Sequence, residues 1–364
     1  MAATGWFKCS RKGGMTSIAA DCCAVIAAIG NRRVRVPGII CTLLIADAGP
    51  NQRQDGHFCR VGIMNLLIGV SMDLKRSWMF VPGHRQRMID KALGLNSDVL
   101  MLDIEDGVAP GEKESARRLI AEALGRERGA GSPARFVRIN AIGHERMDED
   151  LEAVLRPGLD GLVLPKVESA EEVLKVDAVV KEREPGLKVA SGAVGLLVAI
   201  ESPRGLLNGP AIAACSPRVV GLMFGAEDFG RELGLPTARE GEARDMIYAR
   251  SALVVAAASA HVQAVDGVWV DLKDSEGLSG FARQSRRLGF SGMSLIHPSQ
   301  IDPINGVFSP TAEEIEYAEK VVAAYEEAVA RGDGSIAFGG QLIDRPIVER
   351  ARRTLDMAKA LRPG

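Results

Sequence analysis

The stretch SWMFVPGHRQRMIDKALGLNSDVLMLDI, residues 77–104, contains two short apolar runs separated by a longer amphipathic segment. The first run, Ser77–Val81, and the second, Val99–Ile104, are aliphatic, whereas Gln86–Leu95 mixes charged and apolar residues with a helical period. A strand, a helix and a second strand in this order predict a parallel sheet, because parallel neighbours need a long crossover connection.

The same alternation continues along the chain and brings the number of predicted strands to eight. The further apolar runs are Phe136–Ile139, Gly161–Pro165, Gly195–Ile200, Val219–Phe224, Gly267–Leu272 and Gly292–Ile296. The further helical segments are Glu112–Arg126, Met147–Leu155, Ala170–Glu184, Arg204–Ala214, Glu240–Ala260 and Glu276–Leu288. Eight such units favour a (β/α)8 TIM barrel. The alternative is an open doubly wound sheet, but no G-x-G-x-x-G follows the first strand.

The last part of the chain lies outside the barrel repeat. Thr311–Arg331 is a strongly amphipathic predicted helix, Gly332–Gly340 is rich in glycine, and a final helix is expected from Pro346 to Leu361. We therefore expect a catalytic barrel over residues 72–305 and a C-terminal helical extension over residues 306–364. This extension could cover the barrel's own mouth or reach a neighbouring subunit.

Residues 1–71 have a different composition from the rest of the chain. They contain five of the six cysteines and carry a net charge near +5, whereas the whole chain carries −2. We expect this segment to be an atypical N-terminal extension. We interpret it as the product of an upstream start, with Met72 as the true start of the protein, and the alternative is a basic, acid-poor organellar transit peptide. The remaining Cys215 suits a reducing, cytoplasmic location. The overall charge argues against nucleic-acid or membrane-surface binding, and the apolar stretches are too short for a transmembrane helix.

Polar residues gather at the predicted carboxyl ends of the strands, where catalytic groups of such barrels collect. They are Asp103, Glu105, Asp106, Arg138, Asn140, Lys166, Glu201, Glu227, Asp228, Asp271 and His297. Taken alone, Asp106 before Gly107 is an ordinary turn residue, and Asp228 an ordinary helix cap. Together, several ionisable groups at the ends of apolar strands would strain a barrel that gained nothing from them. The sequence therefore predicts an active site here.

The charges at the strand ends suggest particular ligands. Glu201 and Asp228 follow consecutive strands and can approach one another, which a hard cation such as Mg²⁺ would stabilise. Arg138 offers a two-pronged donor to a substrate carboxylate or a developing oxyanion. Arg87 and Lys91 share a helical face after the first strand and could hold phosphates, although such a pair is usually only a solvated surface. His297 before Pro298 is interpreted as structural, and no Cys/His spacing suggests zinc.

A series of motifs resembles the citrate lyase beta-subunit-like branch of the HpcH/HpaI aldolase superfamily, which includes malyl-, citramalyl- and citryl-coenzyme A lyases. The motifs run in order from residue 76 to residue 352, and none falls in residues 1–71. They are RSWMFVPG (76–83), LDIEDGV (102–108), VRINA (137–141), LPKVES (164–169), AIESPRG (199–205), FGAEDF (224–229), IHPSQ (296–300) and GGQLIDRPIVERAR (339–352).

The resemblance implies that Glu201 and Asp228 are the Mg²⁺ ligands and that Arg138 binds the acid end of the substrate. The residues expected to surround and support these groups are Asp103, Glu105, Asp106, Lys166 and Glu227. Glu201 is also expected to contact the substrate.

The resemblance further implies a large thioester substrate and a shared site. Phe80, Arg87 and Lys91 match positions that contact coenzyme A. Asp344 matches the acid/base residue that family members supply to a neighbour's active site. Such members are commonly homotrimers or hexamers of two trimers, so a homo-oligomer is expected.

The expected reaction is a retro-Claisen cleavage of a 3-hydroxy-3-carboxyacyl-coenzyme A to an acyl-coenzyme A and an α-keto acid. Arg138 is the candidate electrophile and Asp344 the candidate proton carrier. Alternatives are a malate-synthase-like enzyme or thioesterase, a class II pyruvate aldolase, and a non-enzymatic acyl-coenzyme A-binding scaffold. Whether the keto acid is glyoxylate, pyruvate or oxaloacetate stays open, because pocket shape discriminates such small differences. The choice between coenzyme A and an acyl carrier protein also stays open.

Overall fold

The computed structural model describes residues 34–36, 39–41, 75–187, 189–236 and 244–361. The chain divides into two compact units, residues 1–73 and 74–364. In the first unit the described residues form the antiparallel strands β1 (Val34–Val36) and β2 (Ile39–Cys41). The expected extension over residues 1–71 otherwise lies outside the described residues.

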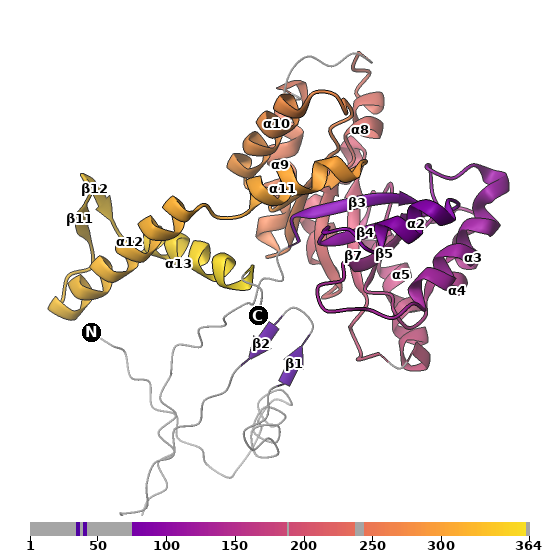
Figure 1. Ribbon diagram of the computed structural model, residues 1–364, viewed down its shortest axis with the longest axis horizontal. Helices are drawn as coiled ribbons and strands as arrows, with labels where there is room; N and C mark the ends of the chain where they lie inside the picture. The colour runs from indigo at the N-terminus through magenta and orange to yellow at the C-terminus, as the bar shows by residue number, and fades with distance from the viewer. Residues whose placement is uncertain (1–33, 37–38, 42–74, 188, 237–243, 362–364) are drawn as a thin grey trace, which may run out of the picture. The chain divides into compact units, whose positions relative to one another are not determined.

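The second unit contains a closed barrel of eight parallel strands, in the order β3 to β10, with β10 paired to β3 (Figure 1). The strands are β3 (Ser77–Pro82), β4 (Val99–Asp103), β5 (Ala134–Arg138), β6 (Gly161–Leu164), β7 (Gly195–Ile200), β8 (Val219–Phe224), β9 (Gln263–Asp266) and β10 (Gly292–Leu295). The prediction of a (β/α)8 barrel is confirmed, and closure excludes the open sheet.

Helices follow the strands. They are α2 (Gln86–Ala92), α3 (Lys113–Leu124), α4 (Met147–Val154), α5 (Ala170–Arg183), α6 (Pro203–Leu207), α7 (Gly209–Ala214), α8 (Ala226–Glu232), α9 (Ile247–Ser259), α10 (Ser275–Leu288) and α11 (Ile301–Phe308). The segment Arg204–Ala214, predicted as one helix, is divided at Asn208 into α6 and α7. Pro210 explains the division, since proline lacks the N–H that would continue the helix. Helix α11 spans the boundary expected after residue 305.

One strand was predicted in the wrong place. The seventh barrel strand is β9, not Gly267–Leu272, because β9 pairs with both β8 and β10. The strand is short and begins with Gln263, so its pattern is weaker than that of the apolar loop that follows it. The acid that ends this strand is therefore Asp266, which is fully buried, whereas Asp271 lies exposed in the loop.

The inside of the barrel is filled by alternate residues of the strands. One cluster contains Trp78, Val99, Met101, Phe136, Val163, Leu197, Ala199, Met223 and Val265. Trp78 and Phe136 meet edge to face, with ring centroids 5.2 Å apart. A second, larger cluster joins the outward residues of the strands to the helices. The interior is a packed core, so ligands have access only at its ends.

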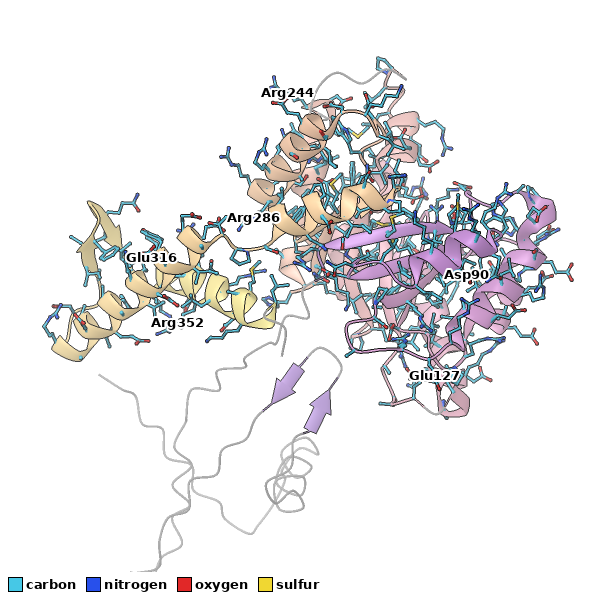
Figure 2. The ribbon with its side chains drawn as sticks, in the orientation of Figure 1. Asp90, Glu127, Arg244, Arg286, Glu316 and Arg352 are labelled. Carbon is cyan, nitrogen blue, oxygen red and sulfur yellow. The ribbon has the colours of Figure 1, made fainter. Side chains whose placement is uncertain are left out.

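The C-terminal extension has its own small core. It consists of α12 (Ala312–Arg331), the hairpin β11 (Ile336–Phe338) and β12 (Gln341–Ile343), and α13 (Arg345–Ala360). Thr311 and Glu314 form a reciprocal cap at the start of α12, which explains why the helix begins there. Arg352 on α13, labelled in Figure 2, pairs with Glu326 on α12 at 3.0 Å. The two predicted helices are confirmed, and the hairpin between them was not predicted.

Among the described residues, no helix is long and apolar enough to cross a membrane.

Candidate active site

Five consecutive strands bring ionisable side chains to the carboxyl end of the barrel. Asp103 and Arg138 are the last residues of β4 and β5, and Lys166 lies two residues after β6. Glu201 directly follows β7, and Asp228 lies in the first turn of α8, which begins two residues after β8. Parallel strands end at one rim of a barrel, so sequence positions more than a hundred residues apart converge there.

Arg138 is held by two carboxylates and an aromatic ring. Its Nε and Nη2 donate to Oδ1 and Oδ2 of Asp103 at 2.7 and 2.8 Å, and its Nη1 lies 3.2 Å from Glu105 Oε2. The guanidinium lies over the ring of Phe80, 4.7 Å from its centroid. Burial opposes its charge, but the hydrogen bonds to Asp103 and the neighbouring carboxylates raise the pKa of Arg138 above its ordinary value. It therefore stays charged, with its outer N–H groups left for a ligand.

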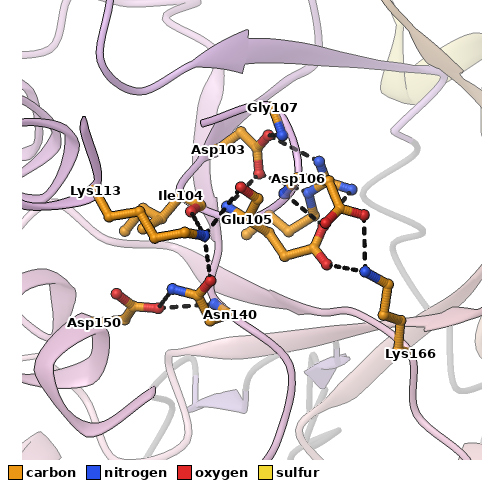
Figure 3. A network of polar contacts seen from close by, with 10 residues as sticks. Asp103, Ile104, Glu105, Asp106, Gly107, Lys113, Asn140, Asp150 and Lys166 are labelled. Carbon is orange, nitrogen blue, oxygen red and sulfur yellow. Dashed lines mark hydrogen bonds and ion pairs between the residues drawn. The ribbon is translucent and has the colours of Figure 1, made fainter. Parts of the chain in front are cut away.

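Lys166 bridges two carboxylates of the loop after β4. Its Nζ lies 2.5 Å from Glu105 Oε1 and 2.8 Å from Asp106 Oδ2 (Figure 3). The backbone of Lys166 has a positive φ of 54°, a left-handed conformation that costs a side-chain-bearing residue about 1–2 kcal/mol. Such strain persists where the surroundings hold it in place, often at functional sites.

Glu201 is the least satisfied carboxylate of the rim. It is buried, and its Oε2 has no hydrogen-bond partner. Burial, together with the charges of Glu105 and Asp228, raises the pKa of Glu201 to about 7 against the opposing charges of Arg138 and Lys166. Gly225 makes room for it, since a Cβ there would lie 2.3 Å from Glu201 Cγ. A buried carboxylate oxygen that no protein group occupies is available to a cation or to water.

The acids after β8 differ in exposure. Asp228 is partly buried and pairs with Arg231 one turn along α8, at 2.7 Å. Glu227 is exposed. The N-terminal turn of a helix favours negative charge, so the first turn of α8 is a suitable place for the carboxylate of Asp228.

The carboxylates at the rim form a donor set that fits Mg²⁺. Glu201 offers a free oxygen, and Asp228 lies near enough for its charge to raise the pKa of Glu201. Among the described residues, no group of three or more His, Cys, Asp or Glu side chains is arranged around a metal position. Magnesium is commonly held by one or two carboxylates together with water and substrate oxygens, so a two-carboxylate site suits it.

The residues expected to contact coenzyme A lie on the first strand of the barrel and on the helix that follows it. Arg87 and Lys91 are exposed on α2, four residues apart, and Phe80 is partly buried near the end of β3. Beside them, Asp90 is taken by Arg126 at 2.5 Å, so the acid on this helix is already neutralised. Positive charge is left available on α2 for an anionic ligand.

Two further candidates have local roles. His297 accepts a hydrogen bond from Ser299 N and begins the short 3-10 turn Pro298–Gln300, a structural arrangement. Asp344 directly precedes α13 and is partly exposed, but its side chain makes no capping hydrogen bond. An aspartate at this position normally caps the helix, so its carboxylate is not committed to the secondary structure.

Sequence reasoning missed the polar network behind the rim. Lys113 on α3 is buried and contacts the loop after β4 and Asn140, and Asn140 in turn contacts Asp150 on α4 (Figure 3). The signal was present, since Lys113 shares a helical face with the buried residues Ala116 and Ile120. A lysine on a buried face needs polar partners.

Residues 76–298 match the family HpcH/HpaI aldolase/citrate lyase. The chain belongs to this family. Citrate lyase subunit beta of Escherichia coli is 38% identical over 285 residues, which cover 78% of this chain and 93% of the relative. The mitochondrial citramalyl-CoA lyase of Homo sapiens is 35% identical over 298 residues, which cover 79% and 86% of the two chains. A (3S)-malyl-CoA thioesterase of Cereibacter sphaeroides is 37% identical over 287 residues, covering 79% and 95%.

A solved structure of this family gives the same fold. CitE from Mycobacterium tuberculosis, in complex with magnesium, acetoacetate and coenzyme A, superposes with a TM-score of 0.65 at 31% identity and covers 79% of this chain and 98% of that chain. The fold and the citrate-lyase-like, acyl-CoA-lyase family membership are thus shown. The similar proteins include lyases and a thioesterase that act on coenzyme A thioesters.

Proposed function

We propose that this chain is a Mg²⁺-dependent lyase that cleaves a 3-hydroxy-3-carboxyacyl-coenzyme A into an acyl-coenzyme A and an α-keto acid. The observation that carries the proposal is the buried, unsatisfied Oε2 of Glu201 at the rim of the barrel. The family relationship supports it, since a citramalyl-CoA lyase and a citrate lyase subunit are among the similar proteins. A solved relative contains magnesium, acetoacetate and coenzyme A together.

Glu201 and Asp228 are the proposed ligands of the ion. When bound, Mg²⁺ would polarise the substrate's hydroxyl and adjacent carboxylate oxygens and lower the pKa of the hydroxyl. Glu201 is suited to this task because a cation would remove the electrostatic penalty of its burial. Gly225 keeps the space that the Glu201 side chain needs.

Arg138 is proposed to bind the acid end of the substrate and to oppose the negative charge that develops during cleavage. A base removes the proton of the substrate's hydroxyl, and its oxygen becomes the carbonyl of the α-keto acid. The bond between the hydroxyl-bearing carbon and the carbon next to the thioester breaks, and its electron pair passes into an enolate of the acyl-coenzyme A, which is then protonated. A fixed guanidinium stabilises such charge well, because it need not reorient during the reaction. Asp103 supplies that orientation through its two hydrogen bonds to Arg138.

Asp344 is proposed to carry the proton during cleavage. This aspartate is proposed to come from a neighbouring copy of the chain. Asp103, Glu105 and Asp106 all pair with Arg138 or Lys166 in the described structure, so their oxygens are already engaged. Asp344 makes no capping bond, and its extension has a core of its own. A homo-oligomer would bring this carboxylate to the rim of another barrel.

Coenzyme A is proposed to lie along α2 near Phe80. Arg87 and Lys91 would pair with its phosphates, since both are exposed and four residues apart on one face of the helix. Phe80 already packs against the guanidinium of Arg138 and could link the thioester end to the reaction centre.

A thioesterase is the second candidate, because one similar protein is a (3S)-malyl-CoA thioesterase. A panel of malyl-, citramalyl- and citryl-coenzyme A, assayed with Mg²⁺, tests both activities. A lyase releases one α-keto acid and an acyl-coenzyme A, whereas a thioesterase releases free coenzyme A. Release of free coenzyme A without keto acid would replace the lyase proposal by the thioesterase, and no turnover of any of the three would contradict both.

A further inference from the structure

We propose that Lys113 is a positioning residue of this active site, which fixes the loop Ile104–Gly107 so that Glu105 aligns Arg138 and Lys166. The inference deepens the proposed function, because it concerns the same rim and the same reaction. Lys113 is not expected to touch the substrate, since it lies behind the loop and is buried.

All the donor capacity of the Lys113 ammonium is directed at this loop and its neighbour. Its Nζ donates to the main-chain carbonyls of Ile104 at 2.8 Å and Glu105 at 3.2 Å, and to Asn140 Oδ1 at 2.5 Å (Figure 3). An ammonium has three N–H donors, so each one has an acceptor. A buried charge held in this way has little freedom to move.

The side-chain amide of Asn140, whose oxygen accepts from Lys113, is itself oriented by the carboxylate of Asp150. Asp150 Oδ2 accepts from Asn140 N at 2.8 Å and from Asn140 Nδ2 at 2.6 Å, while Arg117 Nε donates to Asp150 Oδ1 at 2.8 Å. With its amide nitrogen bound to Asp150, Asn140 presents its oxygen to Lys113. Two helices, α3 and α4, are thereby tied to the end of β5.

Glu105 transmits this restraint to the rim. Lys113 holds the main chain at residues 104 and 105, and the carboxylate of Glu105 lies on the other side of the same segment (Figure 3). There its two oxygens divide between the cations, with Oε1 2.5 Å from Lys166 Nζ and Oε2 3.2 Å from Arg138 Nη1. Glu105 is buried, so displacement of its backbone would directly misplace both pairs.

Arg135 provides a matched structural control. It lies on the same strand as Arg138, is buried, and its Nη1 donates to the carbonyls of Ala123, Leu124 and Arg126. As the second residue of β5, it lies at the amino end of the strand, away from the rim. Arg135 and Lys113 thus both bind main-chain carbonyls through a buried cation, but only Lys113 does so behind the active site.

The test compares Lys113→Met with Arg135→Met in the full chain. Both variants should lower the Tm, because each leaves buried carbonyls unsatisfied. Lys113→Met should lower kcat by at least about tenfold with a smaller change in KM, since misplaced charges act on the transition state. Arg135→Met should keep kcat within about twofold of the parent. Equal kcat values for the two variants would overturn the proposal.

A double-mutant cycle shows whether Lys113 acts through Glu105. Glu105→Gln should lower kcat on its own, and adding Lys113→Met should lower it by less than about twofold more, because the shared pathway is already broken. The Arg135→Met and Glu105→Gln effects should multiply. Multiplicative losses for Lys113→Met and Glu105→Gln would show independent roles and contradict the proposal.

Asp150→Asn is the milder variant if Lys113→Met does not fold, and it should lower kcat in the same direction. A crystal structure of either variant without substrate measures the position of Glu105 directly. We expect the carboxylate of Glu105 to move away from Arg138 or Lys166. An unchanged position of the Glu105 side chain would overturn the positioning role. Since this measurement needs no turnover, it decides the inference even if the parent protein cleaves no thioester, a result that would instead refute the proposed function.

Discussion

Asp103 and Arg138 stand opposite one another in the register of β4 and β5, and their side chains form a two-point ion pair. The pair joins the last residues of two neighbouring strands, so the guanidinium is oriented by the sheet itself. Arg138 was expected to offer its two-pronged edge to a substrate carboxylate, but Asp103 occupies the edge formed by Nε and Nη2. A substrate would therefore meet the remaining N–H groups of a cation already held in place.

Glu201→Gln should abolish Mg²⁺ binding and Mg²⁺-dependent turnover while leaving the fold intact. The amide keeps the shape of the carboxyl group but carries no charge, and it removes the penalty of ionising a group whose pKa is raised to about 7. Calorimetry with Mg²⁺ and turnover assays measure both effects. Glu232→Gln, an exposed change at the end of α8, serves as control and should bind Mg²⁺ normally. Unchanged affinity in Glu201→Gln would rule out this site.

Replacing both Arg87 and Lys91 by Gln should raise the KM for the coenzyme A thioester by about tenfold and leave kcat nearly unchanged, because the lost contacts to phosphate are the same in ground and transition states. At high salt the difference in KM between the parent protein and the double variant should narrow, because screening weakens exposed charges. Lys175→Gln on α5, also exposed, is the matched control. An unaltered KM in the double variant would place coenzyme A elsewhere.

A protein that begins at Met72 should fold and turn over like the full chain. The first barrel strand begins at Ser77, and Arg76 is fixed by Asp98 at 2.8 Å and by Ser309 at 2.8 Å. The boundary between the two compact units falls between residues 73 and 74. Thermal unfolding and turnover of the two proteins should agree. Clear loss of solubility or activity in the shorter protein would show that residues 1–71 belong to the domain.

Mixing inactive Asp344→Ala subunits with inactive Arg138→Ala subunits should restore partial activity. Some mixed interfaces would pair an intact Arg138 with an intact Asp344 from the next chain. Each variant alone should be inactive, and subunit exchange must be demonstrated separately, for example by mass spectrometry of differently tagged chains. If exchange occurs and activity does not return, Asp344 acts within its own chain or has no part in the reaction.

Glu184 should make the stability of the barrel depend on pH in the acid range. Burial opposes its ionisation, but hydrogen bonds from Arg218 and from the backbone N–H groups of Gly192 and Val194 lower the pKa of Glu184 from 4.5 to about 2. A lowered pKa stabilises the fold above the unfolded value near 4.5, and this contribution is lost as the pH falls toward 2.

Urea unfolding of Glu184→Gln and the parent protein measures this effect. The variant should be less stable at pH 7, and the difference between the two free energies of unfolding should narrow once the pH falls below about 4.5. A difference that stays constant between pH 7 and pH 3.5 would show that the ionisation of Glu184 does not couple to folding. Kinetic constants at pH 7 should not change, because Glu184 lies just beyond α5, away from the rim.

The sequence alone determined the barrel and the rim positions of every barrel strand that it placed correctly, but not that of β9, where it predicted Asp271 instead of Asp266. The alternation of apolar and amphipathic segments depends on which residues face the core. This local pattern therefore predicted the order of strands and helices correctly. Arg138 and Asp103 stood out because they end buried strands, and Glu201 because it directly follows one. The pattern failed at β9, where the true strand is less apolar than the loop behind it.

Only the tertiary structure decided which partners these residues meet. The pairing of Arg138 with Asp103, the bridge from Lys166 to Glu105 and the contact of Lys113 with Asn140 join residues from 27 to 61 positions apart. Residues this far apart in the sequence come into contact only when the barrel sets the register of its strands. The unsatisfied oxygen of Glu201 has the same origin, because burial and the neighbouring charges follow from barrel closure and not from local periodicity.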